Sequence, residues 1–326
     1  MTTLYLDRRD TRLKLEGRAL AIYADAERRG TVPLHLLDAV VMRSAVTLES
    51  SLLAQLAEAG IGVLIFGGRN ASKLAVVHGR SHNDGARRIG QLRCVDDPAW
   101  CRRWARVLVR GKLRRQQRLL AQAAAERPDL RQALSKGQQA LAQARQRAAQ
   151  PQPCSLETLR GIEGAAAVGY FRAYTALFAP ELDFTGRNRR PPRDPVNVAL
   201  SLGYTLLHYE AVRACYGAGL DPIIGYYHQL DFGRESLASD LIEPLRPLVD
   251  HWVWTLFRTR RLRADHFARD DDACRLGKAG RQVFYASWEI FIRPHRRLLR
   301  RVARKLAVGL ASAAAAVASA QEDSRP

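Results

Sequence analysis

The chain has 326 residues, 47% of them hydrophobic and 26% charged, which is enough sequence to build one large domain or two ordinary ones. Its 52 Lys and Arg against 32 Asp and Glu give a formal net charge of +20, and most of the basic residues are arginine. Arginine forms bidentate contacts with phosphate, so this excess favours a polyanionic partner: nucleic acid first, an anionic membrane surface second. The excess is concentrated in residues 101–150, which contain 13 basic residues and 2 acidic ones.

Several other classes of protein are disfavoured. The five cysteines have no CxxC pairing, which argues against a zinc site or a disulfide framework and fits a reducing cytoplasm. The first residues do not have the pattern of a secretory signal. The apolar run Leu306–Ala320 is shorter than the ~20 residues that a membrane span requires. Because no phosphate-binding glycine loop is present, nucleoside triphosphate chemistry is not indicated. We expect a soluble, cytoplasmic protein.

Residues 1–80 have the pattern of a small β domain with one helix. Helical spacing over Thr47–Ala59, with Thr47 as the N-cap and Gly60 after the last turn, predicts the helix. Alternating or continuous apolar segments predict strands at Thr3–Leu6, Arg12–Leu15, Arg18–Tyr23, Ile61–Phe66 and Leu74–His78, and Leu34–Met42 is a longer apolar segment.

The polar segment Gly79–Asp84 separates this region from a helical one. Predicted helices follow at Pro98–Ala125, Pro128–Ala149, Leu156–Phe178, Pro195–Tyr216, Pro244–Phe257 and Lys278–Ala320. The last six residues or so are expected to be disordered. The predicted fold class is therefore α+β, with a small sandwich-like β domain over residues 1–80 and a large all-α domain over residues 85–326.

Glu163 is the first candidate site residue. It lies at the edge of an apolar helical stripe, where a carboxylate is costly to bury unless it is paired or binds a cation. Gly161 and Gly164 flank it within one turn and suggest the close approach of another group. The alternative is a partly exposed glutamate that is paired with Arg160 or with an arginine of another helix.

His228 ends the turn Asp221–His228, which delivers aromatic residues and then an imidazole. A neutral imidazole is a common ligand of divalent metals and a good general base. The alternative is a core histidine that is hydrogen-bonded to the backbone.

Asp240 and Glu243 are three residues apart, so on a helix both carboxylates share a face. Paired carboxylates are suitable ligands for hard cations such as Mg²⁺ and Mn²⁺. The alternative is a capping box, with Asp240 as the N-cap and Glu243 at the third helical position.

Taken together, these segments resemble the CRISPR-associated spacer-integration endonuclease family (Cas-one) over roughly residues 1–300. The matching pieces occur in the family's order and at similar separations. They are Gly161–Gly164 (GIEG) with Tyr170, Arg190–Asn197 (RPPRDPVN), Leu200–Leu207, Gly225–His228 (GYYH) and Ser236–Pro247.

The resemblance implies roles for particular residues. Glu163, His228 and Glu243 match metal ligands for Mg²⁺ or Mn²⁺, and Asp240 matches a further acidic position of the active site. Basic residues implied to contact DNA are Arg187, Arg189, Arg190, Arg193 and Arg246. The implied reaction is attack by the 3′-hydroxyl of an incoming double-stranded DNA fragment on a phosphodiester at a repeat border of the target DNA. With water as the attacking group, the same site is a nuclease.

The resemblance also implies partners. These are a second copy of the chain, with residues 1–80 as the dimerisation domain, and a small ferredoxin-like protein of the same adaptation system. Two other functions remain open from the residues alone. One is a non-catalytic basic scaffold that binds nucleic acid, and the other is a membrane-surface protein that uses the Arg-rich helices.

Overall fold

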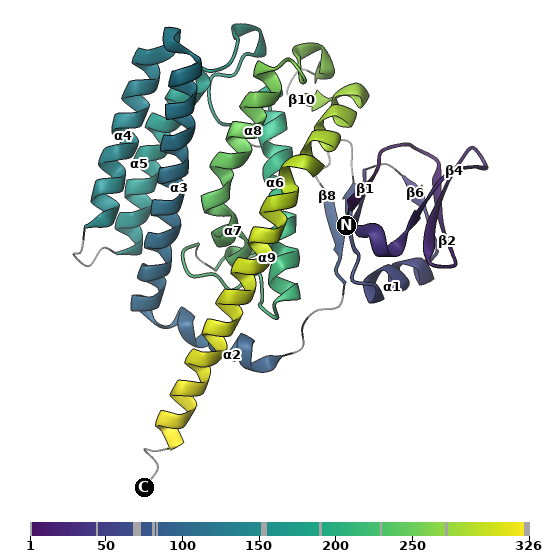
Figure 1. The fold of residues 1–326 in the computed structure, drawn as a ribbon, viewed down its shortest axis with the longest axis horizontal. Coiled ribbons are helices and arrows are strands. Elements are labelled where there is room, and N and C mark those ends of the chain that lie inside the picture. The colour runs from purple at the N-terminus through teal and green to yellow at the C-terminus, as the bar shows by residue number, and fades with distance from the viewer. Residues whose placement is uncertain are drawn as a thin grey trace. The chain divides into compact units, whose positions relative to one another are not determined.

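A computed structural model describes residues 2–43, 45–67, 73–79, 82, 84–150, 155–188, 191–228, 230–270 and 273–322, with only the backbone described at 73, 74, 270 and 313–322. The chain divides into two compact units, residues 1–83 and 84–326, and the division falls within the polar segment Gly79–Asp84. Figure 1 shows the strands of the first unit and the long helices of the second.

The first unit contains two four-stranded sheets, with the strand orders β1-β5-β7-β8 and β4-β3-β2-β6. In the first sheet β1, β5 and β7 are parallel, and β8 pairs antiparallel with β7. In the second sheet β2, β3 and β4 are antiparallel neighbours, and β6 pairs parallel with β2. The strands are β1 Thr2–Leu6, β2 Thr11–Glu16, β3 Ala19–Ala24, β4 Glu27–Pro33, β5 Leu37–Met42, β6 Val46–Thr47, β7 Gly62–Gly67 and β8 Lys73–Val77.

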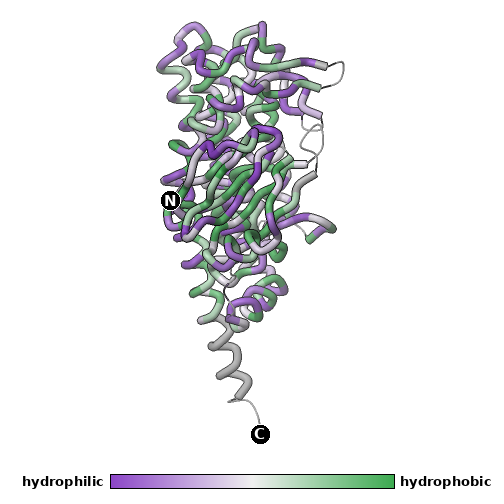
Figure 2. The backbone as a smooth tube through the Cα atoms, turned by 90° about the vertical axis from the view of Figure 1, so that its right-hand side faces the viewer, coloured by the Kyte–Doolittle hydropathy of each residue, from purple (hydrophilic) through white to green (hydrophobic). Residues whose placement is uncertain are grey.

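Apolar residues from both sheets and from helix α1 (Ser50–Glu58) form the core of this unit. Every residue of β5 is buried, as expected for a central strand in parallel pairs that is covered on both faces. Hydrophobic segments follow the strands (Figure 2). This arrangement confirms the predicted sandwich-like β region. The predicted N-cap is wrong, because Thr47 pairs in β6 and α1 begins at Ser50 after Glu49.

The second unit is mainly helical and includes a two-stranded hairpin of β9 (Phe267–Asp270) and β10 (Ala273–Leu276). The expectation of an all-α region is therefore corrected at this hairpin. The α-helices are α2 Gly85–Val95, α3 Pro98–Glu126, α4 Arg131–Ala149, α5 Leu156–Thr175, α6 Pro195–Gly217, α7 Ser236–Ile242, α8 Arg246–Arg258 and α9 Lys278–Glu322. Short 3₁₀ turns lie at Leu34–Leu36, Pro128–Leu130, Pro180–Leu182, Glu243–Leu245 and Ala264–His266.

Helix α9 extends to Glu322, so its last two residues belong to the six that were expected to be disordered. Helices α3, α4 and α5 pack side by side (Figure 1), and α3 also packs against α8 and the turn that precedes it. No helix in the described ranges is long and apolar enough to cross a membrane.

Candidate functional site

The site begins on the buried face of α3. Lys112 lies on the same face as the buried apolar residues Ala105 and Leu108, so it occupies a place where the helix would otherwise present an apolar side chain to the core. Lys112 is 9% exposed. An ammonium group taken out of water in this way is costly unless it meets negative charge.

Helix α5 supplies the first carboxylate. The stripe predicted from the sequence is buried, including Leu159, Ile162 and Tyr170, and it holds Glu163 at its edge with 20% of the side chain exposed. Among the described residues no protein group closely approaches Gly161 or Gly164, since a Cβ atom at either position would meet open space.

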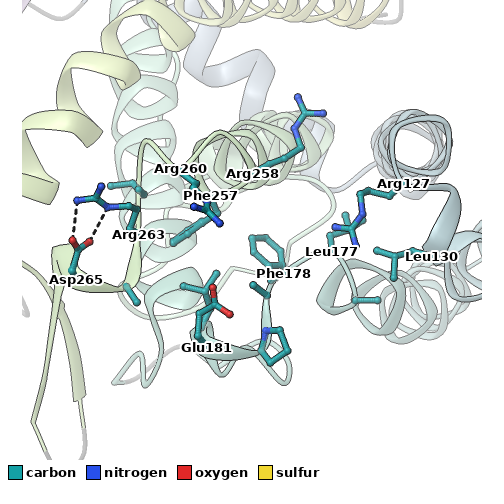
Figure 3. Close-up of a pocket in the computed structure, with 16 residues that line it drawn as sticks. Arg127, Leu130, Leu177, Phe178, Glu181, Phe257, Arg258, Arg260, Arg263 and Asp265 are labelled. Atoms are coloured by element: carbon teal, nitrogen blue, oxygen red, sulfur yellow. Dashed lines mark hydrogen bonds and ion pairs between the residues drawn. The ribbon is translucent and has the colours of Figure 1, made fainter.

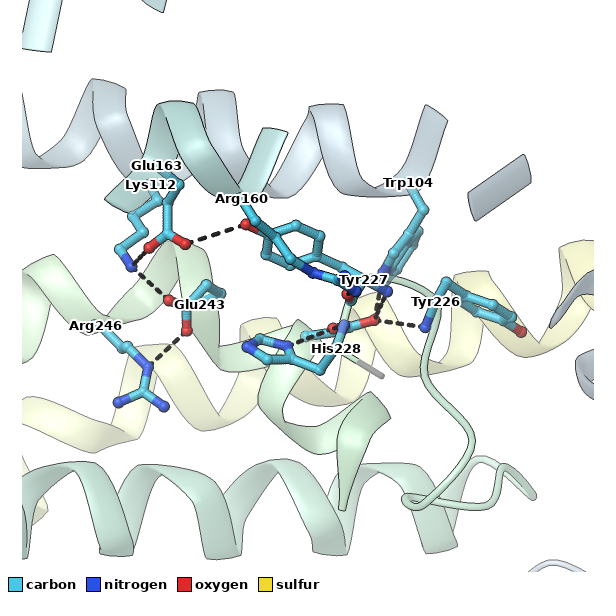
Figure 4. A network of polar contacts seen from close by, with 10 residues as sticks. Trp104, Lys112, Arg160, Glu163, Tyr226, Tyr227, His228, Glu243 and Arg246 are labelled. Carbon is cyan, nitrogen blue, oxygen red and sulfur yellow. Dashed lines mark hydrogen bonds and ion pairs between the residues drawn. The ribbon is translucent and has the colours of Figure 1, made fainter. Parts of the chain in front are cut away.

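The second carboxylate, Glu243, lies in the turn between α7 and α8 and is buried. Lys112 joins the two acids: its Nζ pairs with Oε1 of Glu163, and it lies 2.5 Å from Oε1 of Glu243 (Figure 4). The other oxygens have their own donors. The Tyr227 hydroxyl donates to Oε2 of Glu163 at 3.1 Å, and Arg246 Nε donates to Oε2 of Glu243 at 2.7 Å.

Charge stabilises the ionised form of this cluster. Burial alone would raise the pKa of Glu243, but the cations Lys112 and Arg246 outweigh burial and hold that pKa well below its usual range. Burial alone would lower the pKa of Lys112, but the carboxylates of Glu243 and Glu163 raise it instead. The cluster is therefore a set of buried charges that compensate one another.

Asp240 is fully buried on α7 and holds the turn that carries the aromatic residues and the imidazole. Its Oδ2 accepts the backbone N–H groups of Tyr226 at 2.8 Å and Tyr227 at 3.0 Å, and the indole N–H of Trp104 at 3.0 Å. Its Oδ1 accepts the backbone N–H of His228 at 3.0 Å. The capping-box interpretation is therefore wrong, because Asp240 lies within α7 and serves a distant turn.

The same carboxylate orients the imidazole, with 2.7 Å between His228 Nδ1 and Asp240 Oδ1. When Nδ1 donates that hydrogen bond, the neutral ring presents the lone pair of Nε2 on its other side. His228 lies close enough to act electrostatically on the Glu243 carboxylate. The alternative of a core histidine bonded to backbone does not describe this ring, which is 24% exposed and bonded to a carboxylate.

The carboxylate oxygens of this site suit a hard divalent cation, because Oε1 of Glu163 and Oε1 of Glu243 converge on one cationic atom, the Nζ of Lys112. Within the described ranges, no three His, Cys, Asp or Glu side chains lie close enough to share a metal ion. The structure thus brings Glu163 and Glu243 together and places His228 beside them, with an ammonium group at the shared position.

The predicted DNA-contacting residues differ in their surroundings. Arg187 is held within the protein: it donates to the backbone oxygen of Asn188 at 2.7 Å and to Ser201 Oγ at 3.2 Å, and its guanidinium lies over the Tyr204 ring. Arg246 is held by Glu243, and its guanidinium lies 4.8 Å from the centroid of the same Tyr204 ring. Arg193 is exposed. Arg189 and Arg190 lie outside the described residues.

Sequence reasoning missed three residues of the site: Lys112, Tyr227 and Trp104. A signal was present for Lys112, since it interrupts an apolar stripe of α3, but the concentration of basic residues over 101–150 obscured it. The alternative interpretation of Glu163 as a partly exposed, ion-paired carboxylate is confirmed, but the partner is Lys112 of α3 and not an arginine.

A separate cavity of about 890 Å³ lies where α5 and α8 end (Figure 3). Phe178, Phe257 and several arginines, among them Arg258 and Arg260, line it. None of the predicted site residues lines this cavity. Glu163 and Arg246 each lie 12 residues before the C-terminal end of their helix, which corresponds to about 18 Å along the helix axis. We therefore place the chemistry in the charged cluster rather than in this cavity.

Comparisons with known proteins identify the family and the fold. The family model described as CRISPR associated protein Cas1 matches residues 4–290. A protein of Thermodesulfovibrio yellowstonii named CRISPR-associated endonuclease Cas1 1 is 36% identical over 302 residues, covering 92% of this chain and 94% of that protein. A protein of Thermus thermophilus named CRISPR-associated endonuclease Cas1 3 is 34% identical, covering 88% of this chain and 83% of that one.

Solved structures show the same fold. A CAS1 protein from Thermotoga maritima superposes with a TM-score of 0.80 at 24% identity, over 95% of this chain and 97% of that one. A casposase bound to integration product also gives 0.80, at 21% identity, over 96% of this chain and 91% of that one. The fold class predicted from the sequence is thus confirmed, and the chain belongs to the CRISPR associated protein Cas1 family.

Proposed function

We propose that this chain is a divalent-metal-dependent DNA endonuclease and integrase of spacer acquisition, which joins the 3′-hydroxyl of a DNA fragment to a phosphodiester of a CRISPR array. One observation carries the proposal. Two acids from distant parts of the chain, Glu163 and Glu243, converge on a single cation position beside an imidazole that a buried carboxylate orients. The relatives named CRISPR-associated endonuclease Cas1 support the nuclease class of the reaction.

In this proposal Glu163, Glu243 and His228 would hold Mg²⁺ or Mn²⁺ after their side chains move closer together, since in the described structure the three do not lie close enough to share an ion. When bound, such an ion supplies Lewis-acid polarisation of a phosphodiester oxygen. The protein contributes the rest: Asp240 fixes the tautomer of His228, so that Nε2 can serve as a ligand or accept a proton from the attacking hydroxyl. Lys112 and Arg246 keep the Glu243 carboxylate ionised, and the hydrogen bond from Arg246 also orients it.

The surface beside Glu163 supports access for DNA. Gly161, Gly164 and Ala165 are exposed, and side chains would find open space at the two glycines. A helix face without long side chains leaves room for a sugar–phosphate backbone to come close to a partly exposed carboxylate. We infer that the two glycines serve this approach of the substrate rather than the packing of helices.

A second feature favours DNA as the substrate. Exposed arginines follow one stripe of α3 at spacings of seven, four and four residues, namely Arg103, Arg110, Arg114 and Arg118. This stripe lies on the side of the helix roughly opposite to Lys112, because two residues rotate a helix by about 200°. We propose that it binds phosphates away from the reacting centre, where it adds affinity without base specificity.

Partners are proposed by likeness to the relatives. A solved structure titled Cas6-RT-Cas1--Cas2 complex contains a chain that matches this one with a TM-score of 0.79 at 25% identity, over 95% of this chain and 35% of that one. We propose that this protein forms a homodimer through its N-terminal unit and binds a small ferredoxin-like protein of the adaptation system.

A strand-transfer assay on a branched DNA substrate tests the proposal. Wild type is expected to join the strands with Mn²⁺ present, and Glu163→Gln is expected to lose the reaction while retaining DNA binding. Glu157→Gln is the matched control, because Glu157 lies on the same helix with 76% of its side chain exposed. Wild-type protein that binds branched DNA but transfers no strand in Mn²⁺ or Mg²⁺ would favour the alternative, a non-catalytic basic scaffold.

A further inference from the structure

We propose that Lys112 is the resident cation of the site: its ammonium holds the position between Glu163 and Glu243, and a divalent ion must displace it to bind. This inference rests on the proposed function, because it concerns the same two carboxylates. It goes further in assigning to a residue of α3 a competitive role in metal binding, which makes Lys112 a positioning residue that sets the affinity of the site.

The orientation of the carboxylates is the first argument. Each acid has one oxygen held by a fixed donor, Tyr227 for Glu163 and Arg246 for Glu243. The two remaining oxygens, Oε1 of each, both bond the Lys112 ammonium. The ammonium therefore lies at the point where the free oxygens of the two acids converge. A divalent ion bridging those oxygens would need the same position.

Charge balance is the second argument. In the protein alone two carboxylates face two cations, Lys112 and Arg246, so that the buried cluster is neutral. A divalent ion added beside an unmoved ammonium would place three positive charges within a few ångströms of one another, where unit charges interact strongly in a partly buried site. Exchange of the ammonium for the ion avoids that repulsion.

The side chain itself allows the exchange. A lysine carries a compact charge on a flexible four-carbon stem, so Nζ can leave the acids by rotamer changes while α3 stays in place. The ammonium would remain tethered to the wall of the site. Arg246 is less free to leave, since its guanidinium is also stacked on the ring of Tyr204.

Equilibrium Mn²⁺ binding to the full-length protein, measured by calorimetry and by the spectrum of free Mn²⁺, tests the inference without any activity assay. Lys112→Met removes the competitor and is expected to bind Mn²⁺ at least about tenfold more tightly than wild type. The variant is expected to unfold at a lower temperature than wild type without metal, because the buried Glu243 and the partly exposed Glu163 lose their shared counter-ion. Its thermal stability should rise more with Mn²⁺ than that of wild type.

Lys136→Met, at an exposed position on α4, is the matched control and should bind Mn²⁺ as wild type does. Where Lys112→Met does not fold even with Mn²⁺, Lys112→Gln provides the same comparison with a polar side chain of similar length. Wild-type or weaker Mn²⁺ binding by the Lys112 variant would overturn the inference alone and leave the proposed function standing. If neither wild type nor variant binds Mn²⁺, both proposals fall.

Discussion

Two buried carboxylates of the helical unit, Glu243 and Asp250, have opposite electrostatic properties. Glu243 is 6% exposed, and the cations Lys112 and Arg246 hold its pKa well below its usual range despite burial. Asp250 is 2% exposed, and burial raises its pKa to about 6 although the hydroxyls of Tyr170 and Tyr204 donate to it. Hydroxyl hydrogen bonds only partly offset the loss of water, whereas direct cations more than offset it.

The two environments are neighbours in the fold. Tyr204 donates its hydroxyl to Asp250, and the face of its ring lies against the guanidinium of Arg246, which pairs with Glu243. The molecule thus places a carboxylate that is readily protonated next to one that is held ionised. Only the second kind is suited to bind a cation near neutral pH, and the following predictions test that distinction.

The largest effect is expected at Asp240, a third buried carboxylate that accepts several donors at once. Asp240→Ala should cost about 3–5 kcal/mol in the free energy of unfolding, because the backbone N–H groups of Tyr226, Tyr227 and His228 lose their acceptor. Urea denaturation measures it. Asp265→Ala, at a surface ion pair, should change stability by less than about 0.5 kcal/mol. If Asp240→Ala lowered the free energy of unfolding no more than Asp265→Ala does, Asp240 would not be the residue that holds the Tyr226–His228 turn.

The pH dependence of stability should identify Asp250. Its pKa is raised in the folded state, so the stabilising contribution of the protonated form is complete below the unfolded pKa of 3.8 and is lost as pH rises through about 6. Wild type should therefore lose up to about 3 kcal/mol of stability relative to Asp250→Asn between pH 4 and pH 7. Denaturation of both proteins across this range checks the difference, and a constant difference would show that burial does not dominate at Asp250.

At His228 the expected effect is on activity. His228→Ala should lower strand transfer at least about 100-fold, the usual scale for loss of a general base or ligand. Its stability should change little, because the ring is partly exposed and the backbone bond to Asp240 is retained. The single-turnover rate measures the effect, with His208→Ala as the control. Undiminished strand transfer would remove His228 from the mechanism.

The smallest effect concerns exposed charges, which solvent screens. DNA binding should weaken steeply with salt because phosphate contacts release counter-ions. Replacing Arg110 and Arg114 by alanine should weaken binding severalfold and reduce the slope of log affinity against log salt by about 2. Arg12→Ala in the N-terminal unit is the control. A slope equal to that of wild type would exclude the α3 stripe from the DNA interface.

Apolar periodicity predicted most of the fold, and the exceptions have physical reasons. Strand β4 was missed because it is polar and lies at the edge of its sheet, where few of its side chains need to be apolar. Helix α2 was missed because glycines and charged residues weaken its pattern. Its N-cap, Asp84, gave a local signal that was assigned to a loop.

The site was predictable only as separate pieces. Glu163 could be picked out because a charge at the edge of an apolar stripe requires a partner. That partner, Lys112, is 51 residues away in sequence, and Glu243 is 131 residues from the same lysine. The pattern of residues within one helix does not show which residues so far apart in the sequence come into contact. The resemblance to a family assigned Glu163, His228 and Glu243 to one site, but it gave no role to Lys112, whose ammonium lies between the two acids.

The attachment of the Tyr226–His228 turn to Asp240 has a consequence for amide hydrogen exchange. Three successive amides point at one buried carboxylate, so their protons should exchange with solvent only when the turn opens away from α7. Their exchange rates would therefore report the integrity of the imidazole-bearing turn in the protein alone, before any DNA or metal is added.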